Sequence, residues 1–153
     1  MSRCRVSLAA LLCIVGFAAS GVRADDKAEV EKELKKFHGA WTVESVEAGG
    51  SKLPADLFKG MIVTFEGDKY SVKVGDMQVQ AATMELDPSK SPKTFDSTVT
   101  DGTGTGTVIL SIYEISGDSM KACFDPEGKK RPTEFKTTVG SQTTLAVYKR
   151  MKK

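Results

Sequence analysis

The sequence lacks asparagine altogether and contains a single histidine, His38. The absence of asparagine excludes N-glycosylation, because the acceptor motif requires that residue. A lone histidine has no partners for a typical catalytic zinc site, and no nucleophile-and-base pair stands out around it. We therefore expect no metal site, no cofactor and no enzymatic activity.

Long apolar runs are also missing, with one exception near the N-terminus. Arg3 and Arg5 precede an apolar run over residues 6–19, and small residues follow near Ala24. This order is typical of a secretory signal peptide, and the run is shorter than the roughly 20 residues that a membrane-spanning helix needs. The pattern predicts a signal peptide over 1–24 and a soluble, exported chain in the periplasm, in the cell envelope or outside the cell, with no membrane span.

An excess of charge of either sign is lacking once the predicted signal peptide is removed. Cleavage after Ala24 takes away three of the 22 Lys and Arg residues, so that 19 remain against 20 Asp and Glu. Near-neutrality removes the electrostatic argument for nucleic acid or anionic membranes as partners. Cleavage also removes Cys4 and Cys13, and Cys123 alone cannot form an internal disulfide. The remaining residues, about 129, suffice for one ordinary domain.

Residues 25–37 carry a helical pattern. Val30, Leu34 and Phe37 recur at helical spacing among charged residues, and Gly39 follows as a stop signal. We predict one short amphipathic helix that covers an edge or an end of the domain.

From Trp41 onward the apolar pattern changes to a period of two. The pairs Gly67-Asp68, Gly75-Asp76 and Gly117-Asp118 separate alternating segments. Glycine supplies the positive φ that a two-residue hairpin loop needs, and aspartate tolerates it at the next position. The pattern predicts eight antiparallel strands over 41–48, 61–66, 69–74, 77–86, 93–99, 107–116, 119–124 and 143–150. A helical turn entered through Pro54 and a long irregular connection over 125–142 complete the chain.

The alternation predicts a sheet with one dry and one wet face. The residues assigned to the dry side are Val63, Phe65, Tyr70, Val72, Val74, Met77, Val79, Val108, Leu110, Ile112, Met120, Phe124, Leu145 and Val147. A meander of eight strands hides such a face and both edges most easily by closing into a barrel, which we place at residues 38–153. The phase slips near Ala81 and Ala82, which predicts a bulge or bend there. The fold class is therefore all-β, an eight-stranded antiparallel meander barrel with a short N-terminal amphipathic helix.

Several sequence blocks resemble one family. The Gly39-Ala40-Trp41 entry to the first strand resembles the Gly-x-Trp signature of lipocalins and the wider calycin group. The blocks HGAWTVESVEAGGSKLP, FKGMIVTFEGDKYSV, ELDPSKSPKTFD, IYEISGDSMKACFDPEG and RPTEF together resemble the lipocalin-like domain that is abundant in planctomycete bacteria, whose function is not established. The resemblance covers roughly residues 34–150.

This resemblance implies structural roles at one end of the barrel. In lipocalins the tryptophan packs across the closed end and a basic residue near the end of the last strand covers it. Carried over, Trp41 would be covered by Arg150, or alternatively Lys149, through a cation–π contact. Gly39 would allow a close backbone approach, and His38 would be a helix-end residue near the barrel floor without a chemical role.

Two further segments invite a chemical interpretation. Cys123 shares its strand face with Lys121, as a low-pKa thiol would need, but a lone cysteine is more often a small buried hydrophobe, and we favour that interpretation. The stretch DGTGTGT, residues 101–107, lacks the Gly-Lys-Ser/Thr ending of a phosphate loop, and no helix follows it. We expect a loop at the barrel mouth that could gate a ligand.

Charged pairs give two alternatives. Arg131 and Glu134 could orient a polar head group, or they could form an ion pair that anchors the long connection, and the structural alternative is the stronger. The pairs Asp125 with Glu127 and Asp87 with Asp96 lack the ligand spacing of a recognised calcium loop.

Two functional hypotheses remain. An exported lipocalin-like protein would hold a small apolar or amphipathic molecule inside its barrel, since eight strands enclose either a filled core or room for one small ligand. The residues predicted to contact the ligand are Tyr70, Val72, Met77, Val79, Leu110 and Phe124 as walls and Arg131 at the mouth. Alternatively, large inward residues fill the barrel, which then serves as a structural or protein-interaction module of the envelope through a patch at Tyr113 and Ile115. The sequence names no protein partner.

Overall fold

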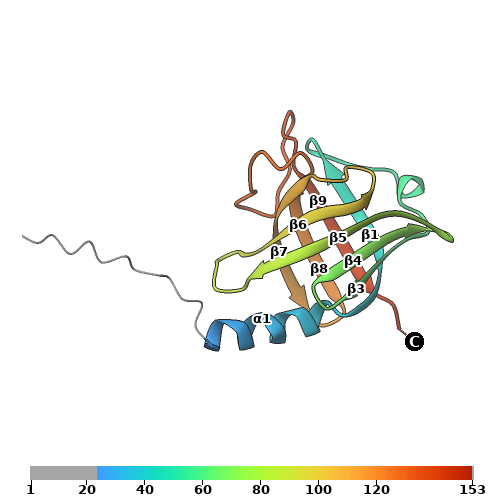
Figure 1. Ribbon diagram of the computed structural model, residues 1–153. Helices are drawn as coiled ribbons and strands as arrows, with labels where there is room; N and C mark the ends of the chain where they lie inside the picture. The colour runs from blue at the N-terminus through green and yellow to red at the C-terminus, as the bar shows by residue number, and fades with distance from the viewer. Residues whose placement is uncertain (1–23, 153) are drawn as a thin grey trace, which may run out of the picture.

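The chain forms one helix followed by a continuous antiparallel sheet (Figure 1). The structure is a computed structural model that describes residues 24–152, so the predicted signal peptide lies outside the described residues except for Ala24. The elements are α1 (Ala24–Phe37), β1 (Gly39–Ala48), β2 (Ser51–Lys52), the 3-10 turn η1 (Ala55–Leu57), β3 (Met61–Glu66), β4 (Lys69–Val74), β5 (Met77–Asp87), β6 (Lys93–Gly102), β7 (Val108–Ser116), β8 (Ser119–Asp125) and β9 (Thr144–Arg150). The predicted helix and the turn after Pro54 are confirmed, whereas the two-residue strand β2 was not anticipated.

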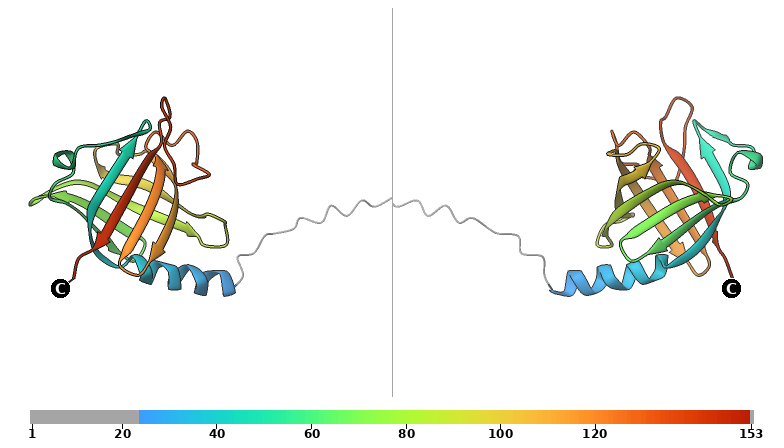
Figure 2. Two further views of the ribbon diagram at one scale, coloured as in Figure 1. Left: turned by 180° about the vertical axis from the view of Figure 1, so that it is seen from behind. Right: turned by 45° about the vertical axis from the view of Figure 1, so that its right-hand side comes forward.

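Eight of these strands close into a barrel. Strands β3 to β8 each pair with the next strand along the chain, and β1 pairs with both β3 and β9. Strand β2 pairs only with β1 and stands outside the ring. Figure 2 shows β1 beside β9 on the side hidden in Figure 1. Closure leaves the eight ring strands without an unpaired edge, and the predicted all-β meander barrel is confirmed.

The hairpin turns follow the glycine signals. Gly67, Gly75 and Gly117 have φ near +60°, at 58°, 60° and 58°. No other residue type in the described chain has a positive φ. The aspartate after each glycine therefore does not adopt the positive φ that we expected it to tolerate. Positive φ at the first loop position alone is the pattern of a type II′ turn, which suits the twist of paired strands.

Two irregularities bend strand β5. The ladder to β6 shifts between Ala81 and Ala82, as the phase slip predicted, and the ladder to β4 shifts between Val72 and Lys73, where Val79 has no partner. Beyond the first shift Met84 is buried in the core. Such bulges increase the local twist, which helps a sheet of this width to close.

Helix α1 lies across one end of the barrel, at the bottom of Figure 1. Its Phe37 is fully buried, and Leu34 packs beside it against the core. The ring of Phe37 lies 5.2, 5.9 and 4.9 Å from the ring centroids of Phe65, Phe95 and Tyr113. We call this helix-covered end the closed end, and the opposite end, where the β4–β5 hairpin and the loop 103–107 lie, the open end.

Part of the long connection after β8 lies against the outside of β7 and β8. Cys123 is fully buried beneath it, with its thiol 3.8 Å from the carbonyl oxygen of Lys136. Ile112, the strand partner of Cys123, is buried on the same outer face. Part of the outer barrel face is therefore apolar and dry.

This cover explains an error in the predicted inward set. On β7 the core and cavity contain Ile109, Tyr113 and Ile115, so Val108, Leu110 and Ile112 face outward. On β9 the core and cavity side carries Ala146 and Tyr148 instead of Leu145 and Val147. Both strands have apolar residues on both faces, so alternation could not indicate which set of residues faces the barrel interior. Tyr113 is also buried, which overturns its suggested place in a surface patch.

Candidate binding cavity

The barrel encloses a cavity of about 280 Å³ above its aromatic floor. Its lining residues come from β3 to β9 and from the loop after β6. They are Met61, Val63, Phe65, Tyr70, Val72, Val79, Gln80, Phe95, Ser97, Thr103, Ile109, Ser111, Met120, Ala122, Phe124 and Tyr148. The walls are predominantly apolar, as expected where alternate residues of seven strands converge. The interior is therefore only partly filled by side chains.

Four of the predicted wall residues line this cavity. Tyr70 and Val72 project from β4, Val79 from β5 and Phe124 from β8. Strict alternation along β4 places the first two on one face, and the hairpin to β5 brings Val79 next to them.

Two other predicted wall residues lie elsewhere. Met77 has the spacing of an inward-facing residue, but it lies at the tip of the β4–β5 hairpin, where 69% of it is exposed. Leu110 faces outward, because its neighbours Ile109 and Ser111 occupy the cavity side of β7. The placement of Leu110 at the wall was therefore wrong, and the placement of Met77 failed because the strand extends past the wall.

Arg131 is not at the mouth of the cavity. Its guanidinium group binds the carboxylate of Asp96 on the outer face of β6, at 2.6 and 2.8 Å, and also donates to the carbonyl oxygen of Ser111 at 2.9 Å. Such a two-pronged arginine–carboxylate pair fixes geometry as well as charge. Arg131 therefore anchors the long connection, as the structural alternative predicted, but its partner is Asp96 and not Glu134.

Sequence reasoning missed two polar residues of the cavity wall, Ser97 and Ser111. They are 0% and 1% exposed, and neither side-chain oxygen has a hydrogen-bond partner in the described chain. In the ladder between β6 and β7, Ser97 is paired with Ile109 and Phe95 with Ser111, so the two serines are diagonal neighbours on one face. Each serine interrupts the apolar pattern of its strand, and this signal is visible in the sequence. Ser111 was nevertheless missed, because the wrong set of β7 residues was predicted to face inward.

Two tyrosines add hydroxyl groups to the same cavity. Burial raises the pKa of Tyr70, and the nearby Ser97 hydroxyl offsets part of that rise. Burial, and to a smaller extent the proximity of Tyr70, raises the pKa of Tyr148. Both phenols therefore stay neutral at physiological pH. Among the described residues, no Asp, Glu, Lys, Arg or His lines the cavity.

The loop after β6 forms part of the rim at the open end. The amide of Thr103 donates to the carbonyl oxygen of Val79 at 3.2 Å, and the Gln80 side chain donates to the carbonyl oxygen of Thr103 at 2.9 Å. Gly102 has a φ of +84°, and a Cβ there would lie 2.2 Å from the Val79 oxygen. The glycine-threonine stretch is thus held against β5 by contacts that only glycine permits at that point.

The tryptophan signature lies at the closed end. Trp41 is fully buried, and its indole nitrogen donates to the carbonyl oxygen of Phe37 at 2.7 Å. The guanidinium carbon of Arg150 lies 4.1 Å from the centroid of the indole ring, which is the cation–π contact that the resemblance implied. Gly39 has a φ of +113°, and a Cβ there would approach Arg150 to 3.6 Å. His38 is exposed at the end of α1, where its carbonyl oxygen accepts from Arg150.

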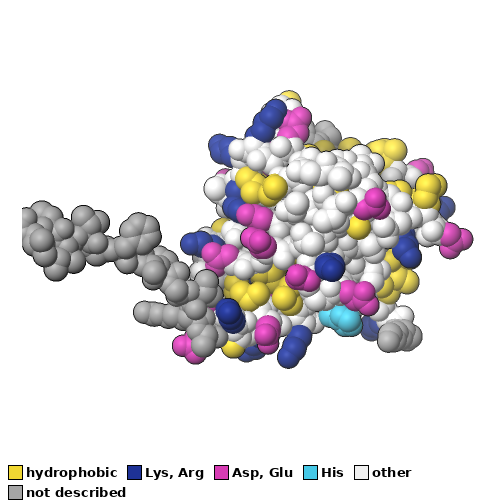
Figure 3. Space-filling model, viewed as in Figure 1, with side chains coloured by type: hydrophobic (Ala, Val, Ile, Leu, Met, Phe, Trp, Pro, Cys, Tyr) yellow, Lys and Arg dark blue, Asp and Glu magenta, His cyan; other side chains and the backbone are white. Residues whose placement is uncertain are grey.

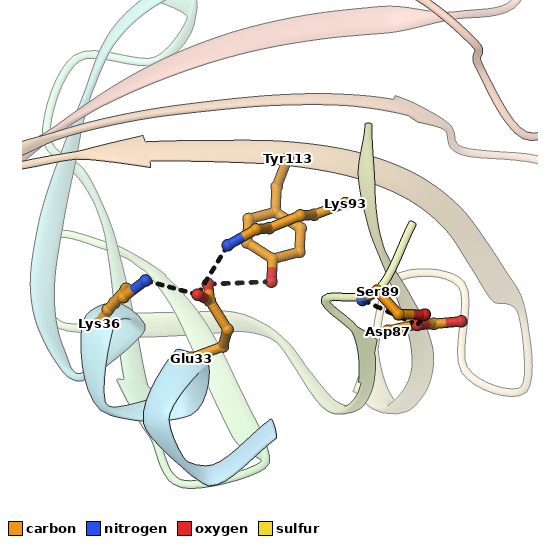
Figure 4. A network of polar contacts seen from close by, with 6 residues as sticks. All are labelled: Glu33, Lys36, Asp87, Ser89, Lys93 and Tyr113. Carbon is orange, nitrogen blue, oxygen red and sulfur yellow. Dashed lines mark hydrogen bonds and ion pairs between the residues drawn. The ribbon is translucent and has the colours of Figure 1, made fainter. Parts of the chain in front are cut away.

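A buried carboxylate fastens α1 to the barrel (Figure 4). Glu33 accepts from Lys36 at 2.5 Å and from Lys93 of β6 at 2.7 Å, and the Tyr113 hydroxyl donates to it at 3.3 Å. Burial alone raises the pKa of Glu33, but the two lysines together hold it below its ordinary value. Sequence reasoning missed this cluster, although Glu33 shares the apolar helix face with Val30 and Phe37 by its spacing.

The other sequence candidates have structural surroundings. Burial raises the pKa of the Cys123 thiol, so Cys123 has the environment of a small buried hydrophobe, as we favoured. Asp125 accepts from the backbone amides of Glu127, Lys129 and Lys130, so it organises the turn that begins the long connection. In residues 24–152 there is no group of three or more His, Cys, Asp or Glu side chains that could hold a metal ion.

Lysine, arginine, aspartate and glutamate side chains are interspersed on the face seen in Figure 3, without a large area of one sign. None of the helices in the described part of the chain is both long and apolar enough to cross a membrane. No protein-family model, curated protein or solved structure matches the chain.

Proposed function

We propose that this protein is an exported, lipocalin-like binding protein that holds a small apolar or amphipathic molecule inside its barrel. The observation that carries the proposal is the cavity of about 280 Å³ with predominantly apolar walls. Protein interiors are normally packed to the density of organic crystals, with few voids larger than a water molecule. A void of this size, in the middle of a regular barrel, is the feature of a small-molecule site.

The alternative of a solid interaction module is less well supported. It requires large inward side chains to fill the barrel, and they do so only at the closed end. Phe65 and Tyr70, whose rings are 5.5 Å apart, border the cavity without filling it. Tyr113, which was to form the interaction patch, is buried.

Export and family membership are parts of the same proposal. Arg3, Arg5 and the apolar run over 6–19 support export through a signal peptide. The Trp41–Arg150 contact and the block order of the sequence support membership in the lipocalin-like family abundant in planctomycetes. The proposal includes no catalytic step, because, among residues 24–152, the cavity wall presents hydroxyl groups without a histidine, carboxylate or lysine to act as their base.

Uptake of an apolar fluorescent probe such as 1-anilinonaphthalene tests the proposal. We expect saturable binding with one site per chain, and loss of that binding in Val72→Phe, which places a ring in the cavity. Leu57→Phe is the matched control, because Leu57 is 67% exposed and does not line the cavity. Absence of saturable uptake, or equal uptake by Val72→Phe, would count against a binding site in the barrel.

A further inference from the structure

Two buried serine hydroxyls stand among the apolar side chains of the cavity wall. Ser97 and Ser111 are buried hydroxyls that form no hydrogen bond of standard geometry in the described chain. Both line the cavity, and the Ser97 hydroxyl lies beside that of Tyr70. An unpaired hydroxyl in an apolar interior is destabilising, so natural proteins rarely keep two on one strand pair. Replacement by alanine would remove that cost at almost no change in volume. Their presence in a predominantly apolar wall therefore points to a ligand group.

The backbone behind these serines is held rigidly from outside the barrel. Arg131 binds the carboxylate of Asp96, the residue before Ser97, and donates to the carbonyl oxygen of Ser111 itself. One side chain of the long connection thus joins the two strands at the point where their inner faces carry the two hydroxyls. Fixed backbone positions are what a recognition site needs, since ordering costs are then met before the ligand arrives.

The charge of the cavity decides which ligand groups are compatible. The hydroxyl groups of the wall are those of Ser, Thr and Tyr side chains, which carry no charge. No charged side chain of the described chain lines the cavity. Burying a carboxylate or an ammonium group without a charged partner is strongly unfavourable, whereas a neutral hydroxyl or carbonyl group needs only one or two hydrogen bonds. The wall therefore suits a neutral polar group and disfavours an ion.

Resting on the proposed function, we infer that the cavity selects an uncharged amphipathic molecule, whose hydroxyl or carbonyl group bonds to Ser97 and Ser111 while its hydrocarbon part fills the apolar remainder. The cavity volume limits the size of that molecule. A volume of about 280 Å³ lies at the lower end of the range of small-molecule sites, so the ligand is small. The ligand class is thus a small neutral alcohol, aldehyde or ketone.

A series of probes with the same chain length tests this inference. Isothermal titration calorimetry at pH 7 would compare 1-octanol, 2-octanone, octanoate and octylammonium on the purified mature chain. We expect the two neutral probes to bind at least about tenfold more tightly than either ion, because the ions lose hydration without gaining a charged partner. Affinity for 1-octanol should be unchanged between about pH 5 and pH 9, since no cavity hydroxyl titrates there.

Two serine variants test the named residues. Ser97→Ala and Ser111→Ala should each weaken 1-octanol binding about two- to tenfold, as expected for one net hydrogen bond, and should leave n-octane binding unchanged. Ser71→Ala is the matched control, because Ser71 lies on the opposite face of β4 from Tyr70 and Val72 and should have no effect.

The outcomes separate the two proposals. Binding of none of the probes would remove the binding function itself. Equal binding of octanol and octanoate, or full octanol affinity in both serine variants, would overturn the selection of an uncharged ligand while leaving a binding function intact.

Discussion

The two ends of this barrel share one sheet but are built in different ways. At the closed end, the aromatic rings of Phe37, Phe95 and Tyr113 interlock, with the Phe95 and Tyr113 centroids 5.8 Å apart. Glu33 and Trp41 each find hydrogen-bond partners there. Toward the open end, the same strands surround a void lined by serine hydroxyls that form no hydrogen bond of standard geometry within the described chain.

This difference teaches where the stability of the fold resides. The closed end buries its large rings and its charged groups together, which is where most of the free energy of folding should arise. The half of the barrel toward the open end is held by ladder closure and by outside anchors, so its interior can remain unfilled. If so, substitutions at the closed end should lower stability, and substitutions at the cavity wall should change binding instead.

The largest effect is expected for Trp41→Ala. The change removes a fully buried ring, its hydrogen bond to Phe37 and the stacking of Arg150. We expect a loss of about 3–5 kcal/mol in the free energy of unfolding, measured by urea denaturation. Leu57→Ala at an exposed site is the control. A loss below about 1 kcal/mol would mean that the closed end is not the principal source of stability.

Glu33→Gln should have the next largest effect, about 1.5–3 kcal/mol, because it removes a buried anion that accepts from two lysines. The pKa of Glu33 is lower in the folded chain, so its stabilising contribution is present above its unfolded pKa and disappears as pH falls through the folded value. The stability difference between wild type and Glu33→Gln should therefore be constant near neutrality and shrink below about pH 4. A difference that does not depend on pH would contradict this assignment.

Ala82→Phe and Val72→Phe compare a filled and an unfilled part of the interior. Both add a ring to the middle of the sheet, but Ala82 is 2% exposed and does not line the cavity, whereas Val72 does. We expect Ala82→Phe to lower stability by about 1–3 kcal/mol and Val72→Phe by less than about 1 kcal/mol. Equal destabilisation by the two variants would indicate that the cavity offers no usable space.

Arg131→Ala should have a small effect on stability, about 1 kcal/mol, because the Arg131 and Asp96 side chains are 32% and 36% exposed. Its clearer readout is the reaction of Cys123 with a thiol reagent such as dithionitrobenzoate. Loosening the long connection should uncover the thiol and increase its labelling rate about tenfold or more, since cysteine reactivity follows exposure. Lys129→Ala, which breaks only an exposed pair with Glu127, serves as the control. An unchanged labelling rate would show that Arg131 does not hold the cover in place.

The sequence predicted the course of the backbone far better than the contents of the barrel. Turn glycines and alternation placed eight strands, and the bulge at Ala81 followed from a phase slip. The phase of β7 could not be predicted, because the connection over its outer face makes Leu110 and Ile112 favourable there while Tyr113 packs inside. A pattern read along one strand contains no information about a cover supplied by residues 20 positions later in the chain.

The candidate site was half predictable for the same reason. Tyr70 and Val72 lie on a strand whose other face is polar, so the alternation placed them correctly, and Val79 and Phe124 were also placed at the wall correctly. Ser111 lies on a strand with two apolar faces, and Arg131 needs the three-dimensional path of the long connection to meet Asp96. Cavity volume depends on how side chains of seven strands meet, which no single strand encodes.

The central claim, that the void in the barrel is a binding site, is tested most directly by native mass spectrometry of the protein purified gently from the cells that produce it. The account predicts a folded species heavier than the mature chain, with the extra mass, that of a small uncharged molecule, released on denaturation. A bare chain in repeated preparations, with no mass gained on exposure to lipid extracts, would contradict it and favour an interaction module.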